Sequence, residues 1–345
     1  MIQGISSMES WKSYLHADAT KWLLEDSNPS VRYFTLRDVV DKPPTKSELT
    51  EVKSYIMRHG AVPEILQKQT DKSYWGEPDR FYRMKYKGTV WQLMILAELG
   101  ADGNNDCIQN ACEFILSHSQ DVDSGGFSHS GRSQNKGGRH CDVIPCLTGN
   151  MVWSLICFGY LQDSRLQRGI EWITRFQRFD DGESTVLKGW PYDRLKTGCF
   201  SKHSCHMGVV KTLKALAEIP EHKRSAAVKK TITKGAEYLL IHHVFKSSHN
   251  LDRVPKPGWL RFGFPLMYQT DALEILCILT KLGYHDLRMQ EAIDVVVSKQ
   301  NSTGTWNLEN TFNGRYQVNI ENKGQPSKWI TLHALQVLKR FYGKK

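Results

Sequence analysis

The segment "KGTVWQLMILAELG" (residues 87–100) has the pattern of a helix that is apolar on nearly every side and ends at a glycine. A helix of this kind must be buried on all sides. Four other segments are mostly apolar and end near a glycine or another breaker: "TGNMVWSLICFGY" (148–160), "MGVVKTLKALAEI" (207–219), "QTDALEILCILTKLGY" (269–284) and "KWITLHALQVLKRFY" (328–342). An earlier segment, "VRYFTLRDVV" (31–40), fits one interval further back.

These segments recur at a nearly fixed interval. Gly88, Gly149 and Gly208 occupy equivalent positions at spacings of 61 and 59 residues, and Asp271 and Thr331 continue the series at spacings of 63 and 60. A constant interval of this size is typical of tandem helical units. The repeat therefore decides the architecture more than any single motif does.

One-sided helices alternate with the apolar ones. Their apolar residues follow three-and-four spacing and their other positions are charged, as in "DCIQNACEFILSHSQ", "SRLQRGIEWITRFQ" and "DLRMQEAIDVVVSKQ". The N-terminal "WKSYLHADATKWLLEDS" (11–27) is expected to supply a further helix of this type. An inner ring of apolar helices wrapped by an outer ring satisfies both patterns. The connections from outer to inner helices are long, and we expect the functional site on the face of the toroid where these long loops lie.

Composition narrows the class of protein. The chain has 345 residues, 40% of them hydrophobic and 24% charged, with a formal net charge of +10. The basic residues are scattered, which favours solvated helix faces over a nucleic-acid partner. No apolar run approaches the roughly 18 residues of a membrane span, and the first residues do not resemble a secretory leader. We therefore expect a cytoplasmic protein.

Eight cysteines occur in the chain, and in this setting a disulfide framework is not expected. Cys107, Cys112, Cys157 and Cys277 lie in helical runs and are expected to be small buried hydrophobes. The remaining four precede two of the apolar helices, where metal binding or catalysis is the stronger hypothesis.

Three turns after the one-sided helices begin with glutamine and end near an aromatic residue: "QTDKSYWG" (69–76), "QDVDSGGF" (120–127) and "QNSTGTW" (300–306), with "QRFDDGES" (177–184) as a degenerate copy. They resemble the Gln–Trp repeats of the squalene cyclase and protein prenyltransferase β-subunit superfamily. The resemblance covers essentially the whole chain. It implies an all-α fold, an (α/α)6 toroid, in which residues 1–345 form one domain of about six helix pairs.

The catalytic motif of the protonating triterpene cyclases, Asp-x-Asp-Asp, is absent from the sequence. This absence argues against protonation-initiated squalene cyclisation. A glycosidase-type acid pair is not indicated either, since the acids near the expected mouth, such as Asp142, Asp193, Asp271 and Glu274, are single and dispersed.

The prenyltransferase β-subunits hold a zinc ion with Asp, Cys and His at the mouth of the toroid. The segments "HCDVIPC" (140–146) and "GCFSKHSCHMG" (198–208) are rich in such ligands. Alignment of the repeats places Cys146 over Cys205, at the starts of adjacent inner helices, where a helix N-terminus favours a thiolate. The family's Asp-x-Cys element is not reproduced. The candidate ligands are Cys141, Cys146, Cys199, Cys205 and His206.

Other uses of these residues remain open. The cysteines can be buried and unligated, they can form a disulfide, or a cysteine can work without metal beside His203 or His206 as base. Asp271 is the preferred pocket acid, with a helix-end charge as the alternative explanation. The candidate catalytic residues are Asp142, His203, Tyr268 and Asp271.

Aromatic residues gather in the long loops and at the starts of inner helices. Each of them taken alone is best explained by packing, but together they suit an apolar central pocket. Aromatic faces also stabilise cationic isoprenoid species. The candidate pocket residues are Tyr86, Trp91, Trp153, Tyr192, Trp259 and Phe264.

These patterns lead to a working hypothesis of a zinc-dependent enzyme acting on a hydrophobic, isoprenoid-type substrate in the central cavity. One alternative is a non-catalytic toroid that binds a lipid or a protein partner, with zinc or cysteines as structure. Another is a metal-free lyase or isomerase that uses Cys, His and Asp.

Overall fold

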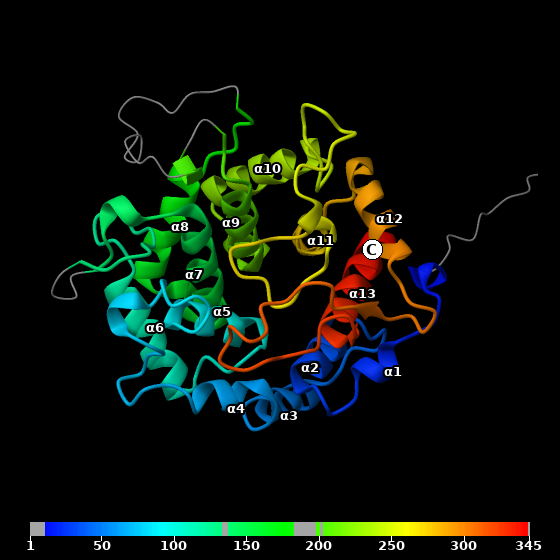
Figure 1. Cartoon of the computed structure of the whole chain (residues 1–345), viewed down its shortest axis with the longest axis horizontal. Helices are drawn as coiled ribbons and strands as arrows, with labels where there is room; N and C mark the ends of the chain where they lie inside the picture. The colour runs from blue at the N-terminus through cyan, green and yellow to red at the C-terminus, as the bar shows by residue number, and fades with distance from the viewer. Residues whose placement is uncertain (1–10, 133–136, 183–197, 201–202, 344–345) are drawn as a thin grey trace, which may run out of the picture.

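The computed structural model describes residues 11–132, 137–182, 198–200 and 203–343. Six helices form an inner ring, which Figure 1 shows around the centre of the molecule. They are α2 (Pro29–Asp38), α5 (Thr89–Glu98), α7 (Pro145–Cys157), α9 (His206–Glu218), α11 (Ala272–Lys281) and α13 (Lys328–Tyr342).

An outer layer of helices covers this ring. Its members are α3 (Lys46–Ile56), α4 (Ala61–Leu66), α6 (Asp106–His118), α8 (Ser164–Phe176), α10 (Ala226–Ile241) and α12 (Gln290–Ser298). Each buries one stripe, as Ile108, Cys112 and Ile115 do on α6. Each outer helix except α4 packs against the inner helix that precedes it, and α4 packs against the one that follows it. The predicted all-α (α/α)6 toroid is therefore confirmed.

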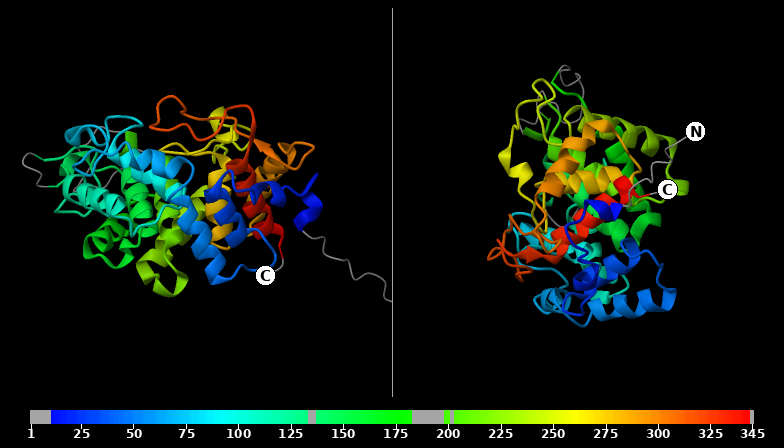
Figure 2. Two further views of the ribbon diagram at one scale, coloured as in Figure 1. Left: turned by 90° about the horizontal axis from the view of Figure 1, so that it is seen from below. Right: turned by 90° about the vertical axis from the view of Figure 1, so that its right-hand side faces the viewer.

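The ring closes between its first and last members. From α5 to α13 each inner helix packs against the next one, and α13 packs against α2. The Nζ of Lys339 donates to the carbonyls of Val39 and Val40 at 2.8 and 3.0 Å, and Gln336 Nε2 donates to Asp38 Oδ2 at 2.8 Å. Polar contacts thus reinforce the junction between the two ends of the described chain. Figure 2 shows α13 beside the first helices in two further views.

The N-terminal segment differs from the expectation of one outer helix. It forms the 3-10 helix η1 (Trp11–Tyr14) and the short helix α1 (Thr20–Leu23), both packed against α13. Asp18 Oδ1 accepts the backbone N–H of Thr20 at 2.9 Å, which fixes a turn between the two pieces. The sequence pattern did not reveal this break.

The Gln–Trp turns join consecutive repeats. In two of them the indole N–H donates back to the end of the preceding outer helix: Trp75 to Ile65 O at 2.8 Å, and Trp306 to Val296 O at 2.7 Å. The backbone N–H of the aromatic residue donates forward to a threonine Oγ1 on the next inner helix. These pairs are Trp75–Thr89, Phe127–Thr148 and Trp306–Thr331, at 3.1, 2.9 and 3.0 Å.

The remaining regular elements lie in the connections. Two short strands, β1 (Trp306–Asn307) and β2 (Pro326–Ser327), pair antiparallel before α13. The other 3-10 helices are η2 (Pro78–Arg80), η4 (His140–Asp142), η5 (Tyr160–Gln162), η6 (Gly198–Phe200), η7 (Glu221–Lys223), η8 (Pro257–Leu260) and η9 (Leu287–Met289). In the described part of the chain, no helix has the length and apolarity needed to cross a membrane.

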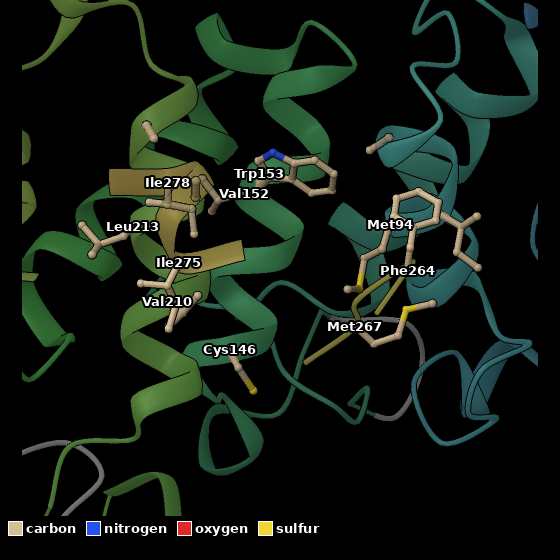
Figure 3. Packing of buried hydrophobic residues seen from close by; sticks show 14 of the residues in the cluster. Met94, Cys146, Val152, Trp153, Val210, Leu213, Phe264, Met267, Ile275 and Ile278 are labelled. Atoms are coloured by element: carbon tan, nitrogen blue, oxygen red, sulfur yellow. The ribbon is translucent and has the colours of Figure 1, made fainter. Parts of the chain in front are cut away.

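The loop before α11 fills the ring at the N-terminal end of the inner helices. Phe264 and Met267 are buried, and Figure 3 shows both between α5 and α7, close to Met94. Asn150 Nδ2 on α7 donates to the Met267 carbonyl at 3.3 Å and helps to anchor the loop. The interior beyond this loop lies toward the C-terminal ends of the inner helices.

Candidate functional site: a central cavity and a thiol-rich mouth

A cavity of about 370 Å³ lies inside the ring. All six inner helices line it, mainly with residues from their C-terminal halves, and the loop residues Gly263, Phe264 and Leu266 also contribute. The position follows from the fold, because an inner ring leaves a central space wherever side chains do not meet. A cavity of this size is in the range of small-molecule sites.

Aromatic rings form part of the cavity wall. Phe264 stacks on Trp329 with ring centroids 4.2 Å apart, and Phe34 approaches Trp329 at 6.0 Å. Trp153 stands on α7 with the Lys214 ammonium 3.9 Å from its ring centroid. These rings give the site an apolar wall, with Phe264 and Trp153 among the residues that the sequence predicted for the pocket.

A buried ion network lies beside the rings. The Nζ of Lys211 on α9 contacts both carboxylate oxygens of Glu274 on α11 at 2.7 Å, and Lys211 is fully buried. Lys214 pairs with Glu98 on α5 and lies 3.4 Å from Glu274. Three inner helices are thereby linked by charge. The predicted apolar pocket is therefore wrong in part, since charged groups share its lining.

The network keeps the Glu274 carboxylate ionised. Burial opposes the charge on Glu274, but Lys211 and Lys214 outweigh it and lower the pKa of this carboxyl. Burial likewise opposes the charge on Lys214, and Glu98 and Glu274 outweigh it and raise the pKa of this ammonium. Such paired charges are stable only together, since removing one leaves the other buried and uncompensated.

Asp271 behaves differently from its neighbours. It is the N-cap of α11: its Oδ1 accepts the Glu274 N–H at 2.8 Å and its Oδ2 accepts the Gly263 N–H at 2.9 Å. Burial raises its pKa to about 7, although these two hydrogen bonds favour the charged form. Asp271 also lines the cavity. A carboxyl that titrates near neutral pH can donate or accept a proton there.

Two further titratable groups border the cavity from the last two inner helices. Burial lowers the pKa of His333 to about 4, with Lys214 contributing, so the imidazole is neutral at pH 7. Burial raises the pKa of Cys277 to about 12, so its thiol keeps its proton. The expectation that Cys277 only packs is incomplete, since it also lines the cavity.

The rim of the cavity carries more exposed pairs. Arg37 forms a two-bond pair with Asp38 at 2.7 Å, Lys281 pairs with Glu218 at 2.5 Å, and Arg340 lies 3.7 Å from Asp38. These groups stand at the C-terminal ends of the inner helices, away from the loop that contains Phe264. The charged part of the site is thus distributed from the interior to the rim.

The predicted cysteine cluster forms in part, at the opposite end of the ring. The thiol of Cys199 lies within hydrogen-bonding reach of both Cys146, in the first turn of α7, and Cys205, the N-cap of α9. The alignment of repeats thus placed Cys146 and Cys205 correctly at adjacent helix starts. We call Cys146, Cys199 and Cys205 the thiol cluster; none of them lines the central cavity.

Cys199 and Cys205 of this cluster keep their protons rather than forming activated thiolates. Contact with Cys146 is the main cause that raises the pKa of Cys199 to about 12. Contact with Cys199 and burial raise the pKa of Cys205, although the backbone N–H groups of Gly208 and Met207 oppose the shift. The expectation of a helix-stabilised thiolate is therefore wrong for Cys205.

Two predicted ligands lie apart from the cluster. Cys141 is exposed, with its Sγ 3.7 Å from Asp142 Oδ1. The ring of His206 stacks on Trp259 at 4.3 Å, and burial lowers its pKa to about 3. Among the described residues, no group of three or more His, Cys, Asp or Glu side chains converges as a metal site. Cys199 contacts both Cys146 and Cys205, but the three thiols do not surround a common position for a metal ion.

The other predicted catalytic residues are dispersed. Asp142 lies in η4, 3.9 Å from His129 Nε2 and 3.7 Å from Arg139. His203 is exposed and lies against Gly182. Tyr268 lies at the N-terminal end of the ring beside Trp91. Of the four, only Asp271 lines the cavity.

The remaining predicted pocket residues belong to the same end as Tyr268. Tyr86 contacts Trp91 edge to face at 5.1 Å and also approaches Phe312 at 4.6 Å. Trp259 packs on His206, as described above. Tyr192 lies outside the described residues. The predicted pocket is therefore divided between two places in the fold.

Several groups of the site are absent from the candidates that the sequence indicated: Glu98, Lys214 and His333, which line the cavity, and Lys211, which pairs with the lining residue Glu274. A pattern could have indicated them: they are charged or titratable residues within otherwise apolar inner helices. The wall residue Trp329 is also absent from the predicted pocket residues.

No protein-family model matches this chain, and no curated protein sequence matches it. Among solved structures, similar ones include type II terpene cyclase MstE from Scytonema. A variant in complex with geranylgeranyl dihydroxybenzoate is 14% identical with a TM-score of 0.42, covering 92% of this chain and 87% of that chain. The apo enzyme is 13% identical with a TM-score of 0.40, covering 92% and 98%.

Because the TM-scores of this likeness lie below 0.5, it assigns neither a family nor an activity to the chain. The ring architecture stands on the packing of the helices themselves.

Proposed function

We propose that this protein is an enzyme that acts on a hydrophobic, isoprenoid-type molecule held in the central cavity, with Asp271 as the group that transfers a proton. The observation that carries the proposal is the position of Asp271, a buried carboxyl with a pKa of about 7, on the lining of a cavity walled by aromatic rings. Acid–base chemistry on an apolar substrate needs these two features together.

The chemistry expected at this site is that of a lyase or isomerase working without metal. Protonated Asp271 gives its proton to a carbon–carbon double bond of the substrate, and the aromatic faces of Trp153, Phe264 and Trp329 stabilise the carbocation that forms. The Asp271 carboxylate then takes a proton from a carbon next to the cation, which leaves a shifted double bond and restores the acid. Lys211 and Lys214 keep Glu274 ionised, so that Glu274 contributes negative potential beside the site.

Occupancy of the cavity is tested with a pair of matched variants. Ala217 lines the cavity on α9, whereas Ala227 is exposed on the outer helix α10. We expect isoprenoid alcohols such as farnesol and geranylgeraniol to raise the melting temperature of the wild type and of Ala227→Leu. Ala217→Leu, which fills the cavity, should lose this shift. Equal shifts in both variants would place the ligand elsewhere.

The role of Asp271 is tested separately. In a product screen by mass spectrometry with isoprenoid substrates, Asp271→Asn should keep ligand binding and lose turnover by about 10²-fold or more, the usual contribution of a general acid or base. Turnover that survives this substitution would remove Asp271 from the mechanism and leave binding as the function of the cavity.

A zinc-dependent reaction is the second candidate, and it rests on the thiol cluster. The donor set of Cys146, Cys199 and Cys205 fits a zinc ion in chemistry, since three soft ligands come from the starts of two adjacent inner helices and the segment between them. Although the three thiols do not converge on one point in the described residues, zinc held by them would supply Lewis-acid chemistry to a substrate. Asp142 and His203 have no place in this donor set.

Metal analysis distinguishes the two candidates. Purified protein with one zinc per chain, lost in Cys199→Ser but retained in Cys141→Ser, would support the zinc site. Protein without zinc that still turns over an isoprenoid substrate would support the metal-free reaction. If neither zinc nor turnover is found while ligands bind, the non-catalytic alternative, a toroid that binds a lipid, takes their place.

A further inference from the structure

A lysine ammonium at the N-terminal end of the ring lies among three aromatic rings. Lys85 Nζ is 4.6 Å from the ring centroid of Tyr268, 5.3 Å from that of Tyr82 and 6.0 Å from that of Trp91. Among the described residues this ammonium has no hydrogen bond or ion pair, and its contacts are those with the three rings. We call Tyr82, Trp91 and Tyr268 the aromatic cage.

The walls of the aromatic cage come from three separate segments and are held in place. Trp91 is in the first turn of α5, and its indole N–H donates to the Tyr82 carbonyl at 2.8 Å. The rings of Tyr82 and Trp91 lie 4.9 Å apart, and those of Trp91 and Tyr268 lie 6.3 Å apart. Behind Trp91, the hydroxyl of Tyr86 accepts from Gln269 Nε2 at 3.0 Å. The cage therefore does not depend on Lys85 for its shape.

The chemistry of the cage selects a cation over an anion. Aromatic faces attract positive charge, and several faces around one centre are the arrangement that recognises quaternary ammonium groups. Lys85 is exposed, and its ammonium is tethered by a flexible side chain, so an external cation can displace it. No carboxylate pairs with Lys85 in the described residues, so displacement breaks no ion pair there.

We propose that the aromatic cage is a binding site for an organic ammonium ion, best a quaternary one, and that Lys85 occupies it in the free protein. The site is distinct from the central cavity, since Tyr82, Trp91, Tyr268 and Lys85 are not among the cavity lining. It does not depend on the proposed reaction at Asp271.

The test compares choline with 3,3-dimethylbutan-1-ol, a neutral molecule of the same shape, by ligand-observed NMR titration. Choline should bind and its methyl resonance should shift upfield because of the ring currents, whereas the neutral molecule should bind much more weakly. Lys85→Ala should bind choline about fivefold more tightly, since one exposed cation–π contact no longer competes. The control Lys87→Ala, an exposed lysine two residues away, should match the wild type.

Ring variants complete the test. Tyr268→Leu should lose choline binding, and Tyr55→Leu, which removes an aromatic ring on the outer helix α3, should not. If Tyr268→Leu fails to fold by circular dichroism, Tyr82→Leu replaces it. Equal binding of choline and its neutral counterpart to Lys85→Ala, or no binding of either at millimolar concentrations, would overturn the proposal.

A second arm separates the sources of such a group. Vesicles of phosphatidylcholine present the same trimethylammonium group on a lipid surface. Binding of choline without vesicle binding would identify a free metabolite as the ligand class, and binding to vesicles that Tyr268→Leu abolishes would identify a lipid headgroup. Either result supports the cage.

Discussion

The two ends of the inner ring present different chemistry. At the N-terminal ends of α5, α7 and α9 stand neutral, soft and aromatic groups, namely the thiol cluster and the aromatic cage. In the interior stand ion pairs between helices, centred on Lys211 in the first half of α9 and Glu274 in the first turn of α11. The pair of Lys281 with Glu218 stands at the C-terminal ends. Both sets of groups belong to the same ring of inner helices, but the loop that carries Phe264 and Met267 lies between them.

The difference reflects which elements supply the groups. The charged residues belong to the bodies of inner helices, so helix packing fixes their positions relative to one another. The thiols and rings come from first turns and connections, such as Cys199 in η6 and Tyr82 after η2. The ion network is therefore expected to be a rigid part of the core, whereas the mouth can adjust to a ligand or metal.

The largest effect is expected from breaking the ion network. Glu274→Gln leaves Lys211 fully buried without its counter-charge, and we expect the free energy of unfolding to fall by about 3–5 kcal/mol. Urea denaturation followed by circular dichroism measures this change. Replacing both partners, as in Lys211→Met with Glu274→Leu, should recover most of the loss. A single variant as stable as the wild type would show that the network does not hold the core.

The next effect concerns the pH dependence of stability. Asp271 is ionised in the unfolded chain above its ordinary pKa, but in the folded chain it keeps its proton up to about pH 7. This group therefore makes the folded state less stable as the pH rises from about 4 to about 7, and its contribution is constant above that. Between pH 5 and pH 8 the free energy of unfolding should fall by about 3 kcal/mol less in Asp271→Asn than in the wild type. Parallel pH profiles of the two proteins would contradict the raised pKa.

Thiol reactivity sharpens the comparison at the other end of the ring. Cys199, whose pKa is raised to about 12, holds little thiolate at pH 8. We expect N-ethylmaleimide to modify Cys199 and Cys205 at least about tenfold more slowly than the exposed Cys141, since the thiolate is the nucleophile. Peptide mass spectrometry of a time course gives the three rates. Equally fast labelling of all three would mean that the thiol cluster does not form.

The smallest effect is expected at the rim of the cavity. Lys281 and Glu218 form a pair that is about a third exposed, with side-chain exposures of 34% and 29%. Lys281→Ala should lower the free energy of unfolding by no more than about 1 kcal/mol, because solvent screens such pairs. The same denaturation assay measures it. A loss as large as that of Glu274→Gln would place the rim pair in the core network.

The fold could be predicted from the sequence to a large extent. Helices that are apolar all round, repeated at a constant interval, admit few arrangements, and the segment 31–40 indeed became α2 (Pro29–Asp38). The Gln–Trp turns added the connection between repeats. What failed was the N-terminal segment, where the local hydrogen bond of Asp18 divides a pattern that reads as one helix.

The site was harder to predict, for physical reasons. Repeat alignment could place Cys146 and Cys205 side by side because both occupy the same register. It could not place Cys141 or His206, whose side chains are oriented by their loop and by Trp259. The pairing of Lys211 with Glu274, 63 residues apart, depends on how neighbouring helices rotate about their axes, which periodicity does not fix.

The closure of the ring has a consequence for how the chain folds. Most inner helices meet a neighbour from the adjacent repeat, but the contacts of Gln336 and Lys339 with the end of α2 span 298 to 300 residues. The entropic cost of closing a loop grows with the length of the loop, so the contact between α13 and α2 is the costliest junction of the inner ring to form. During synthesis α13 also leaves the ribosome after every other inner helix. Until α13 is synthesised, the side of α2 that it covers stays exposed to water, and a chaperone that shields apolar surface would bind there.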